Sequence, residues 1–208
     1  LAAKKVEGDR DFEAQMKANP QKVKARFDKA TAVKRMSDSL YNFAQQLKVA
    51  IVKEADGEDG DVFNIERKDD LEAANQVMLA PGKGQGKRLF DAINSFRERI
   101  LSMVADERQK AIIASNLTTT LPKNAKTMGK NWQEYMFEDM PVAAAVTLLT
   151  KLQSDVRYAE GEVLHTLVAN IDVKDIRVNK LRAFVIPNAQ TIVRGYKFSP
   201  QIAVAYTH

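Results

Sequence analysis

Two long stretches of this chain carry apolar residues at every third or fourth position, the repeat of a helix with one buried face. The first stretch opens with Asn19-Pro20, a start signal in which Asn caps the helix and Pro takes its first position. Its apolar members are Val23, Phe27, Ala30, Val33, Leu40, Ala44, Leu47 and Ile51. We expect a helix near residues 20–53, which at 1.5 Å per residue is a rod of roughly 50 Å.

The second stretch starts at Pro141 and predicts a helix over residues 141–170. Its members follow an almost unbroken heptad pattern: Ala145, Leu149, Leu152, Val156, Ala159, Val163 and Thr166. We expect Leu149 and Val156 to be core residues. Replacing Lys151 or Arg157 is expected to cost less than about 1 kcal/mol. Two polar residues interrupt the stripes, Ser37 and Gln153; they either set the helix register or lie at the edge of the surface.

The two stretches differ in charge. Residues 19–54 carry eight Lys/Arg against three Asp/Glu, whereas residues 131–170 carry two against six. Helices of opposite charge attract when they lie side by side, although apolar burial contributes more than exposed ion pairs. This pairing explains the basic stretch, which also lacks the interleaved aromatic residues of a stacking platform. We therefore predict no nucleic-acid partner, in spite of a net charge of +5.

Shorter elements are predicted between the two long helices. Apolar spacing indicates helices near residues 71–78 and 89–104, the second with an option to extend through Ile113. Asn131 and Glu134 form a pattern typical of a capping box before a short aromatic helix. We interpret its three aromatic residues as a lid packed on the end of the bundle: Trp132, Tyr135 and Phe137.

Two loops resemble ligand-binding motifs but fail on spacing. In an acidic loop that starts at Asp56, the twelfth position of a calcium-binding EF-hand would be Arg67 instead of Glu, so we predict a solvated loop between helices. The glycines of residues 82–87 lack the spacing of a phosphate-binding loop, and Arg88 stands where Ser or Thr would hold magnesium. No apolar strand precedes them, so we predict a flexible connector.

Few residue types in this chain can perform chemistry. Cysteine is absent, and the two histidines are His165 and His208. Glu162 and His165 form one Glu-x-x-His motif, but a di-metal bundle needs several, and Glu160 lies on a different helix face from Glu162. We therefore predict no catalytic residue, no metal site and no cofactor, and hence not an enzyme.

The pattern changes after residue 171. Three segments are strand-like: Leu181–Pro187, Thr191–Gly195 and Gln201–Tyr206. They are too few to enclose a core. The predicted fold class is mainly α, a helical bundle with long helices over residues 1–172 followed by an incomplete, sandwich-like β segment, the start of a β domain, over residues 177–208. We expect residues 1–18 to be a frayed helix from an upstream membrane anchor, and the chain to begin inside a longer protein.

The run Phe137–Leu164 resembles the GldM/PorM family of gliding-motility and type IX secretion proteins of Bacteroidetes. Further similarity lies in Asn19–Lys24, Arg67–Leu71 and Val185–Pro187. The resemblance implies an inner-membrane protein with one N-terminal transmembrane helix outside this fragment. It also implies a long, dimeric periplasmic region, with a helical domain followed by β domains.

The same resemblance implies a non-enzymatic structural and coupling role. The missing transmembrane helix would join a GldL/PorL-type partner in a proton-driven motor, and later domains would reach outer-membrane-associated secretion components. We accordingly expect a periplasmic, inner-membrane-anchored homodimer. Residues after Arg177 are expected to pair with, or cross over to, the second chain, and the helical bundle to contribute a second contact surface. The alternative is a ligand- or metal-binding periplasmic helical sensor domain. An incomplete β segment favours the coupling role, because a finished sensor would not stop within a sheet.

Overall fold

A computed structural model describes residues 20–169, 181–187 and 200–206 of the chain. The chain divides into two compact units, one of residues 26–168 and one that contains residues 169–208 together with residues 1–25. The predicted division into domains of residues 1–172 and 177–208 stays a prediction.

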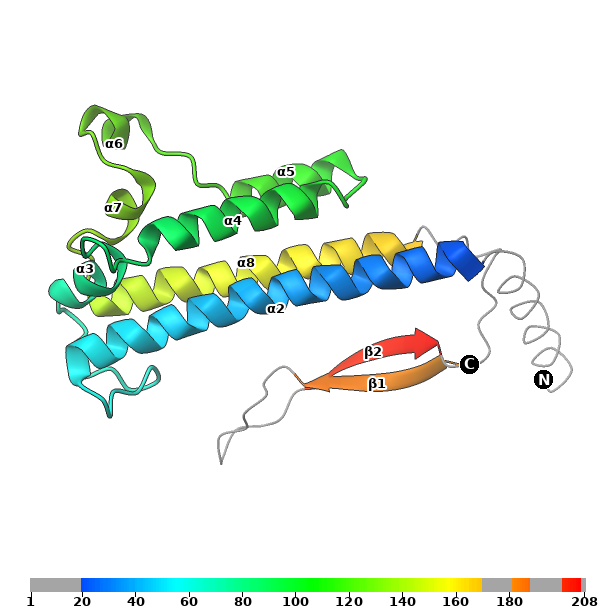
Figure 1. Cartoon of the computed structure of the whole chain (residues 1–208), viewed down its shortest axis with the longest axis horizontal. Helices are drawn as coiled ribbons and strands as arrows, with labels where there is room; N and C mark the ends of the chain where they lie inside the picture. The colour runs from blue at the N-terminus through cyan, green and yellow to red at the C-terminus, as the bar shows by residue number, and fades with distance from the viewer. Residues whose placement is uncertain (1–19, 170–180, 188–199, 207–208) are drawn as a thin grey trace, which may run out of the picture. The chain divides into compact units, whose positions relative to one another are not determined.

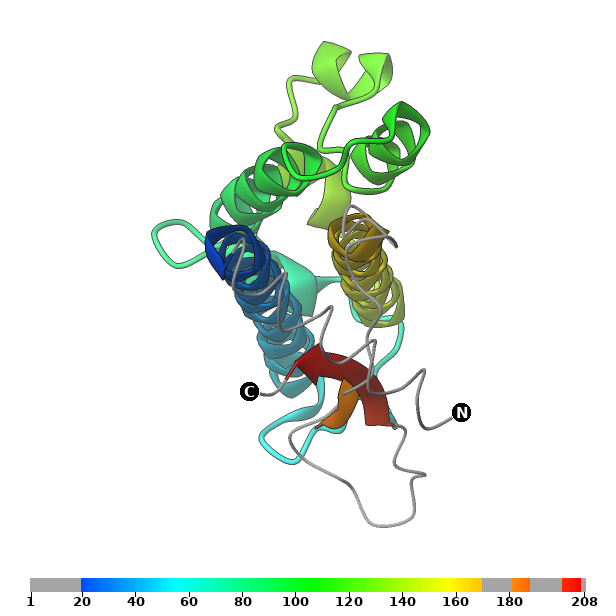
Figure 2. The same cartoon turned by 90° about the vertical axis from the view of Figure 1, so that its right-hand side faces the viewer.

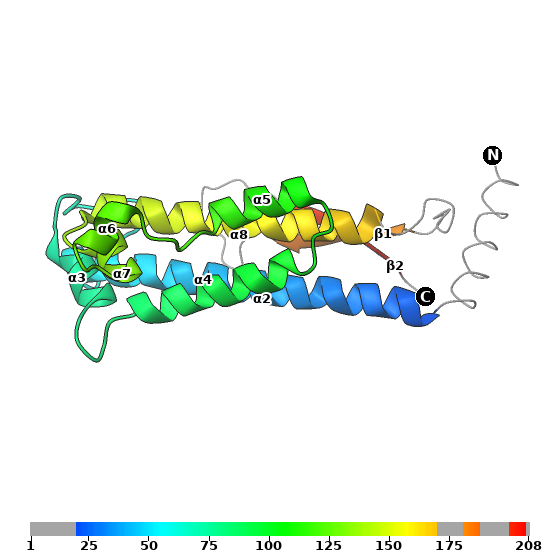
Figure 3. The ribbon, with the colours of Figure 1, turned by 90° about the horizontal axis from the view of Figure 1, so that it is seen from above.

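Two long helices, α2 (Pro20–Asp56) and α8 (Val142–Ala169), lie side by side and antiparallel (Figure 1). Five shorter helices connect them: α3 (Glu72–Met78), α4 (Gly86–Leu101), α5 (Glu107–Asn116), α6 (Lys123–Thr127) and α7 (Trp132–Phe137). An end-on view places α4 over α2 and α5 over α8, as a second layer (Figure 2). The view from above agrees (Figure 3). The two predicted long helices and their side-by-side packing are confirmed.

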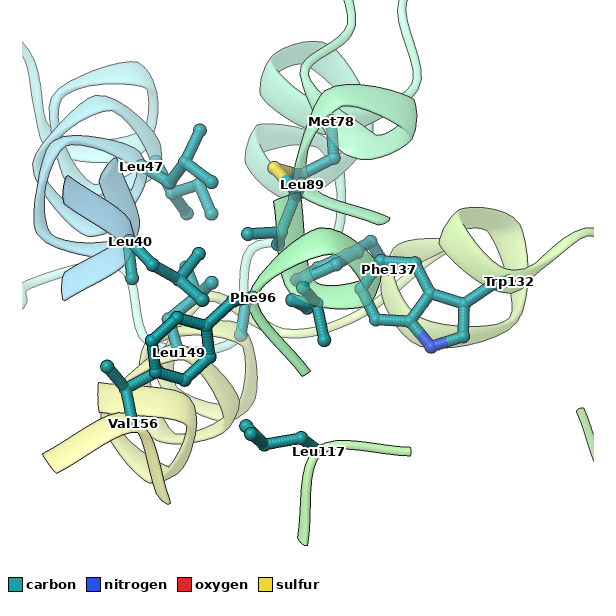
Figure 4. Close-up of a cluster of buried hydrophobic side chains, with 14 of the residues drawn as sticks. Leu40, Leu47, Met78, Leu89, Phe96, Leu117, Trp132, Phe137, Leu149 and Val156 are labelled. Carbon is teal, nitrogen blue, oxygen red and sulfur yellow. The ribbon is translucent and has the colours of Figure 1, made fainter. Parts of the chain in front are cut away.

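The core of the helical unit lies where the two layers meet. Leu149 and Val156 are 1% and 0% exposed, which confirms their predicted place. Ten of the buried side chains are labelled in Figure 4: Leu40, Leu47, Met78, Leu89, Phe96, Leu117, Trp132, Phe137, Leu149 and Val156. Each large apolar side chain that is fully buried contributes about 1.5–3 kcal/mol, so this cluster is the main source of stability.

Polar groups fix where the helices start. The Asn131 side chain accepts a hydrogen bond from the Glu134 N–H and donates one to the Glu134 carboxylate, so the predicted capping pattern is present. Asp106 caps α5 by accepting from the Arg108 N–H at 2.8 Å. The helix predicted near residues 89–104, with its optional extension through Ile113, is therefore two helices, α4 and α5, and Asp106 starts the second.

The first turn of α8 is capped by main-chain carbonyls that are distant in sequence. The Val142 N–H donates to the Asp70 carbonyl and the Ala143 N–H to the Lys68 carbonyl, both at 3.1 Å. These bonds satisfy two N–H groups that the helix itself leaves without partners. The segment before α3 is therefore fixed against the start of α8.

The glycine-rich turn before α4 is packed more tightly than a flexible connector. A Cβ atom at Gly84 would lie 2.5 Å from the Met78 carbonyl oxygen, and one at Gly86 would lie 2.6 Å from the Gln133 Cβ. Larger residues would push α3 and α7 away from this turn. The prediction of flexibility is wrong here, because close approach of α3 and α7 requires the glycines.

Beyond the helical unit, strands β1 (Leu181–Pro187) and β2 (Pro200–Tyr206) pair antiparallel, with Leu181 opposite Tyr206. They coincide with two of the three strand-like segments. The third, Thr191–Gly195, lies outside the described residues, as do residues 1–18. The mainly helical fold class is confirmed, while the start of a β domain stays a prediction.

Candidate functional site

Four polar side chains are buried where α2 faces α8. Ser37 and Lys48 of α2 are 0% and 8% exposed, and Gln153 and Glu160 of α8 are 4% and 8% exposed. Buried polar groups cost free energy unless they are hydrogen-bonded, so their partners determine what this interface does. We call these residues and the polar side chains that contact them the polar seam: Ser37, Asp38, Tyr41, Gln45, Lys48, Gln153, Arg157 and Glu160.

One end of the polar seam is organised by Arg157. Its Nη1 lies 2.9 Å from the Ser37 Oγ, 2.7 Å from the Asp38 Oδ1 and 2.9 Å from the Glu160 Oε2. The Ser37 hydroxyl also donates to Glu160, at 2.6 Å. The guanidinium carbon lies 4.3 Å from the centroid of the Tyr41 ring, a cation–π contact. One arginine of α8 thus contacts three side chains of α2.

The charge on Arg157 is retained in this environment. Burial by itself lowers the pKa of an arginine, but hydrogen bonds to Asp38 and Glu160 outweigh it and raise the pKa of Arg157 above its ordinary value. Glu160 therefore has a permanently charged partner close by. The cluster is an ion pair supported by hydrogen bonds, and such clusters lose most when one member is removed.

The other end of the polar seam is organised by Gln153. Its Oε1 accepts from the Lys48 Nζ at 3.0 Å, and its Nε2 donates to the Tyr41 carbonyl and the Gln45 Oε1, both at 3.1 Å. The Gln153 amide therefore both donates and accepts across the helix interface. Burial lowers the pKa of Lys48, and among the described residues no carboxylate forms a salt bridge with it.

The polar seam favours one axial alignment of α2 against α8. Sliding one helix past the other by a turn, about 5.4 Å, would separate every pair described above that joins α2 to α8. An apolar interface tolerates such a shift more easily, whereas buried polar groups left without partners cost about 1–3 kcal/mol each. Two roles were open for Ser37 and Gln153: setting the helix register, or lying at the edge of the surface. The first applies, because both side chains are buried and hydrogen-bonded across the interface.

Two residues of the polar seam depart from what the sequence predicted. Arg157 was expected to be a dispensable surface residue, and Glu160 was considered only as a metal ligand. Both lie one or two turns along α8 from Gln153, on the face toward α2. The sequence does show that polar residues, Ser37 and Asp38, interrupt the apolar stripe of α2. It does not show which residues of α8 contact them, because that depends on how the helices pack.

The other candidate residues lie apart from the polar seam. The His165 side chain is exposed on α8, and His208 lies outside the described residues. Trp132 and Phe137 are buried and in contact with each other, with ring centroids 6.1 Å apart, whereas Tyr135 is 41% exposed. The lid prediction therefore holds for two of its three aromatic residues. Beside it, a hydrogen bond to Glu138 raises the pKa of Lys130.

Asp56, the last residue of α2 and the first of the predicted acidic loop, holds the following chain in place through its carboxylate. The Asp56 carboxylate accepts from the Glu66 and Arg67 N–H groups, each at 2.9 Å. This side chain is thus occupied by main-chain donors. Across the described ranges 20–169, 181–187 and 200–206, no three His, Cys, Asp or Glu residues gather as a metal site. No helix of those ranges is long and apolar enough to cross a membrane.

The fold and the polar seam define a class of protein: a helical bundle module whose long helices are held in one alignment. Comparison with protein families identifies the class more closely, because the family model for the GldM N-terminal domain matches residues 8–170. The chain belongs to the GldM family and is a protein of gliding motility and type IX secretion. No curated protein matches it.

Proposed function

We propose that this chain is a non-enzymatic structural and coupling module of the type IX secretion and gliding-motility motor. In this role it links an inner-membrane, proton-driven motor to outer-membrane components. The observation that carries the proposal is the polar seam, which aligns two long antiparallel helices. A part that transmits movement along its length needs this property, because helices that slide past each other dissipate displacement.

The dimensions of the helix pair suit the role. α2 has 37 residues, and at 1.5 Å per residue it is a rod of roughly 55 Å. Glu160 and Gln153 of α8 contact α2 at Ser37 and Lys48, so the seam spans about three turns of α2 and about two turns of α8. Apolar burial supplies stability along the rod, and the seam opposes axial slip.

Family membership supports the rest of the proposal. The chain lies in the periplasm, is anchored to the inner membrane by a helix outside this fragment, and forms a homodimer. A GldL/PorL-type partner binds the membrane helix, and outer-membrane-associated components bind domains that follow this chain. The alternative, a ligand- or metal-binding sensor, has no supporting observation within the described ranges.

The coupling role is tested by weakening the polar seam in the full-length protein in gliding cells. Arg157→Met combined with Glu160→Gln removes the ion pair but keeps side-chain size close to the original. We expect slower gliding and reduced secretion at unchanged protein abundance, because α2 and α8 are no longer held in one alignment. Lys126→Ala, on the exposed face of α6, is the matched control.

Normal gliding and secretion by the seam variant, with its altered pairing verified in the purified domain, would contradict the coupling role. The periplasmic location is tested separately. Protease added to spheroplasts should digest this region, while a cytoplasmic marker stays intact.

A further inference from the structure

The first turns of α2 concentrate the positive charge of this chain. Residues 20–35 contain six of its 32 Lys/Arg and one of its 27 Asp/Glu, so all other residues together carry 26 of each. The net charge of +5 therefore equals the net charge of this one segment. We call the six cations and the phenylalanine among them the basic end of α2: Lys22, Lys24, Arg26, Phe27, Lys29, Lys34 and Arg35.

Ion pairs within the chain do not account for these cations. Lysines of other helices, such as Lys87 and Lys151, pair with an acid one turn away, but none of the six forms a salt bridge with a described carboxylate. Among the described residues, the ion pair that joins α2 to α8 has its acid on α2, Asp38, and its base on α8, Arg157. The attraction expected between a basic α2 and an acidic α8 thus leaves the basic end of α2 without carboxylate partners in residues 20–169.

An apolar side chain lies exposed among the cations. Phe27 has 64% of its surface exposed, whereas Val33, further along the same apolar stripe of α2, is completely buried. The core therefore covers this stripe at Val33 but not at Phe27. Exposed aromatic residues next to Lys and Arg are typical of helices at a lipid–water interface, where the ring enters the headgroup region and the cations meet phosphates.

The cations of the basic end lie on more than one side of the helix. Lys22, Arg26 and Lys29 follow at spacings of four and three and share a face, whereas Lys24 and Arg35 lie on the opposite side. A folded acidic protein would contact one of these faces. Anionic lipid headgroups are mobile and gather around charges on several sides, and their attraction extends about 8–10 Å from the bilayer. Charge and the exposed ring together favour a membrane as the partner.

We propose that the basic end of α2 binds the surface of a membrane that contains anionic lipids. Its Lys and Arg side chains pair with headgroup phosphates, and Phe27 enters the interfacial region between headgroups and acyl chains. This contact holds the first turns of α2 against the bilayer. It goes beyond the coupling role and is tested apart from it, because vesicle binding by the purified chain requires neither a motor nor a partner protein.

Binding is measured by flotation of the full chain with two kinds of vesicle. One kind is phosphatidylcholine alone, and the other contains about one third phosphatidylglycerol, an anionic lipid. At about 50 mM salt the chain should float with the anionic vesicles and not with the neutral ones, and about 0.5 M salt should release most of it. No binding to anionic vesicles in low salt, or equal binding to neutral vesicles, would overturn the proposal.

Two triple variants with the same change in net charge locate the contact, each checked for an unchanged circular dichroism spectrum. The first reverses three exposed cations of the basic end: Lys24→Glu, Lys29→Glu and Arg35→Glu. The control reverses three exposed lysines outside it: Lys83→Glu, Lys123→Glu and Lys126→Glu. The first should weaken binding to anionic vesicles about tenfold or more, and the control less than about threefold. Equal losses would reduce the effect to net charge and refute the site.

A single fluorescent label tests whether lipid surrounds Phe27, since the chain has no cysteine of its own. Asp28→Cys carries an environment-sensitive dye beside Phe27, and Thr150→Cys on α8 carries the same dye as a control; both positions are exposed. Anionic vesicles should shift the emission at position 28 to shorter wavelength, less so when Phe27→Ser is added, and leave position 150 unchanged. No shift at position 28, or an equal shift at position 150, would overturn the proposal.

A soluble polyanion distinguishes a membrane from an acidic protein. Polyglutamate at the same concentration of negative charge as the anionic vesicles should bind the full chain more weakly than they do, because it offers no interfacial region to Phe27. Tighter binding of polyglutamate than of the vesicles would make an acidic protein the partner and overturn the membrane contact.

Discussion

At the scale of single residues, Arg157 contacts three residues across the helix interface, as many as Gln153 does. It contacts Ser37 and Asp38 of α2 by hydrogen bonds, Tyr41 by its guanidinium face and Glu160 within its own helix. Its side chain is 33% exposed, so solvent weakens part of this attraction. Removing it nevertheless leaves the Ser37 hydroxyl as the one hydrogen-bond partner of the buried Glu160 carboxylate among the described residues.

Arg157→Ala is therefore expected to destabilise the protein by about 1–3 kcal/mol, less than for a fully buried ion pair. Lys151→Ala is the matched control on the same helix, since Lys151 is 64% exposed and its replacement should cost less than about 1 kcal/mol. Urea denaturation of both variants gives the comparison. Equal losses would mean that the Arg157 contacts contribute nothing beyond a surface ion pair.

Lys48 presents the opposite case, because its burial is a cost. The double variant Lys48→Met with Gln153→Leu replaces the pair by apolar residues, and we expect stabilisation by about 1–4 kcal/mol near neutral pH. Lys48→Met alone should gain less, since the Gln153 oxygen then loses its donor. Denaturation at pH 7 decides, and a less stable double variant would show that the pair adds net stability.

The advantage of that double variant should shrink in alkaline solution. Burial depresses the pKa of Lys48 in the folded state below its ordinary value of 10.5. Between the two pKa values the unfolded chain binds more protons, so the stability of the original protein rises with pH there. Below the folded-state pKa the difference should be constant. Denaturation midpoints of both proteins from pH 7 to pH 10.5 test the sign, and a gap that widens with pH would contradict it.

At the scale of elements, the apolar stripe of α8 determines which of its faces is buried. Leu149 and Val156 are one heptad apart and both point into the core cluster (Figure 4). The same stripe contains Gln153 between them, so core and polar seam share one face of the helix. Stability and alignment therefore come from neighbouring positions.

Leu149→Ala should cost about 2–5 kcal/mol, because it removes buried surface and leaves a cavity among residues that cannot fully close it. Val156→Ala deletes fewer atoms and should cost about 1–3 kcal/mol. Thermal and urea unfolding measure both. Thr150→Ala, exposed on the same helix, is the control, and a loss at Leu149 no larger than at Thr150 would place the core elsewhere.

At the scale of the whole molecule, the strand pair raises the question of what covers its edges. β1 and β2 pair with each other along residues 181–187 and 200–206, and a two-stranded sheet is marginal by itself. Strand edges with unpaired N–H and C=O groups favour pairing with another chain. In a longer protein later strands would supply that pairing, and a second copy of this chain can also supply it.

Removing residues 177–208 should therefore weaken dimerisation about tenfold or more, equivalent to about 1.4 kcal/mol. Helical circular dichroism should stay nearly intact, because the core cluster lies within residues 26–168. Sedimentation equilibrium of the parent and truncated chains gives the affinities. An unchanged affinity would place the interface in the helical unit alone, and a monomeric parent would refute the dimer.

The sequence by itself determined the two long helices, their buried faces and the capping of α7. These features depend on local spacing. A helix with apolar residues at every third or fourth position has one face that is favourable to bury, and the capping of α7 by Asn131 requires Glu134 three residues further along. Family membership could likewise be inferred from the order of elements. Residues whose roles are local were therefore placed correctly, Leu149 and Val156 among them.

Only the tertiary structure decided which polar residues meet. Arg157 lies 119 residues from Asp38 and Glu160 lies 123 residues from Ser37, and no local pattern relates such pairs. The tight glycine turn at Gly84 likewise depends on how closely Met78 approaches, which spacing does not show. Burial of an apolar stripe is nondirectional and permits several alignments of α2 and α8. Hydrogen bonds are directional, so the alignment follows from contacts that exist only after the helices have packed.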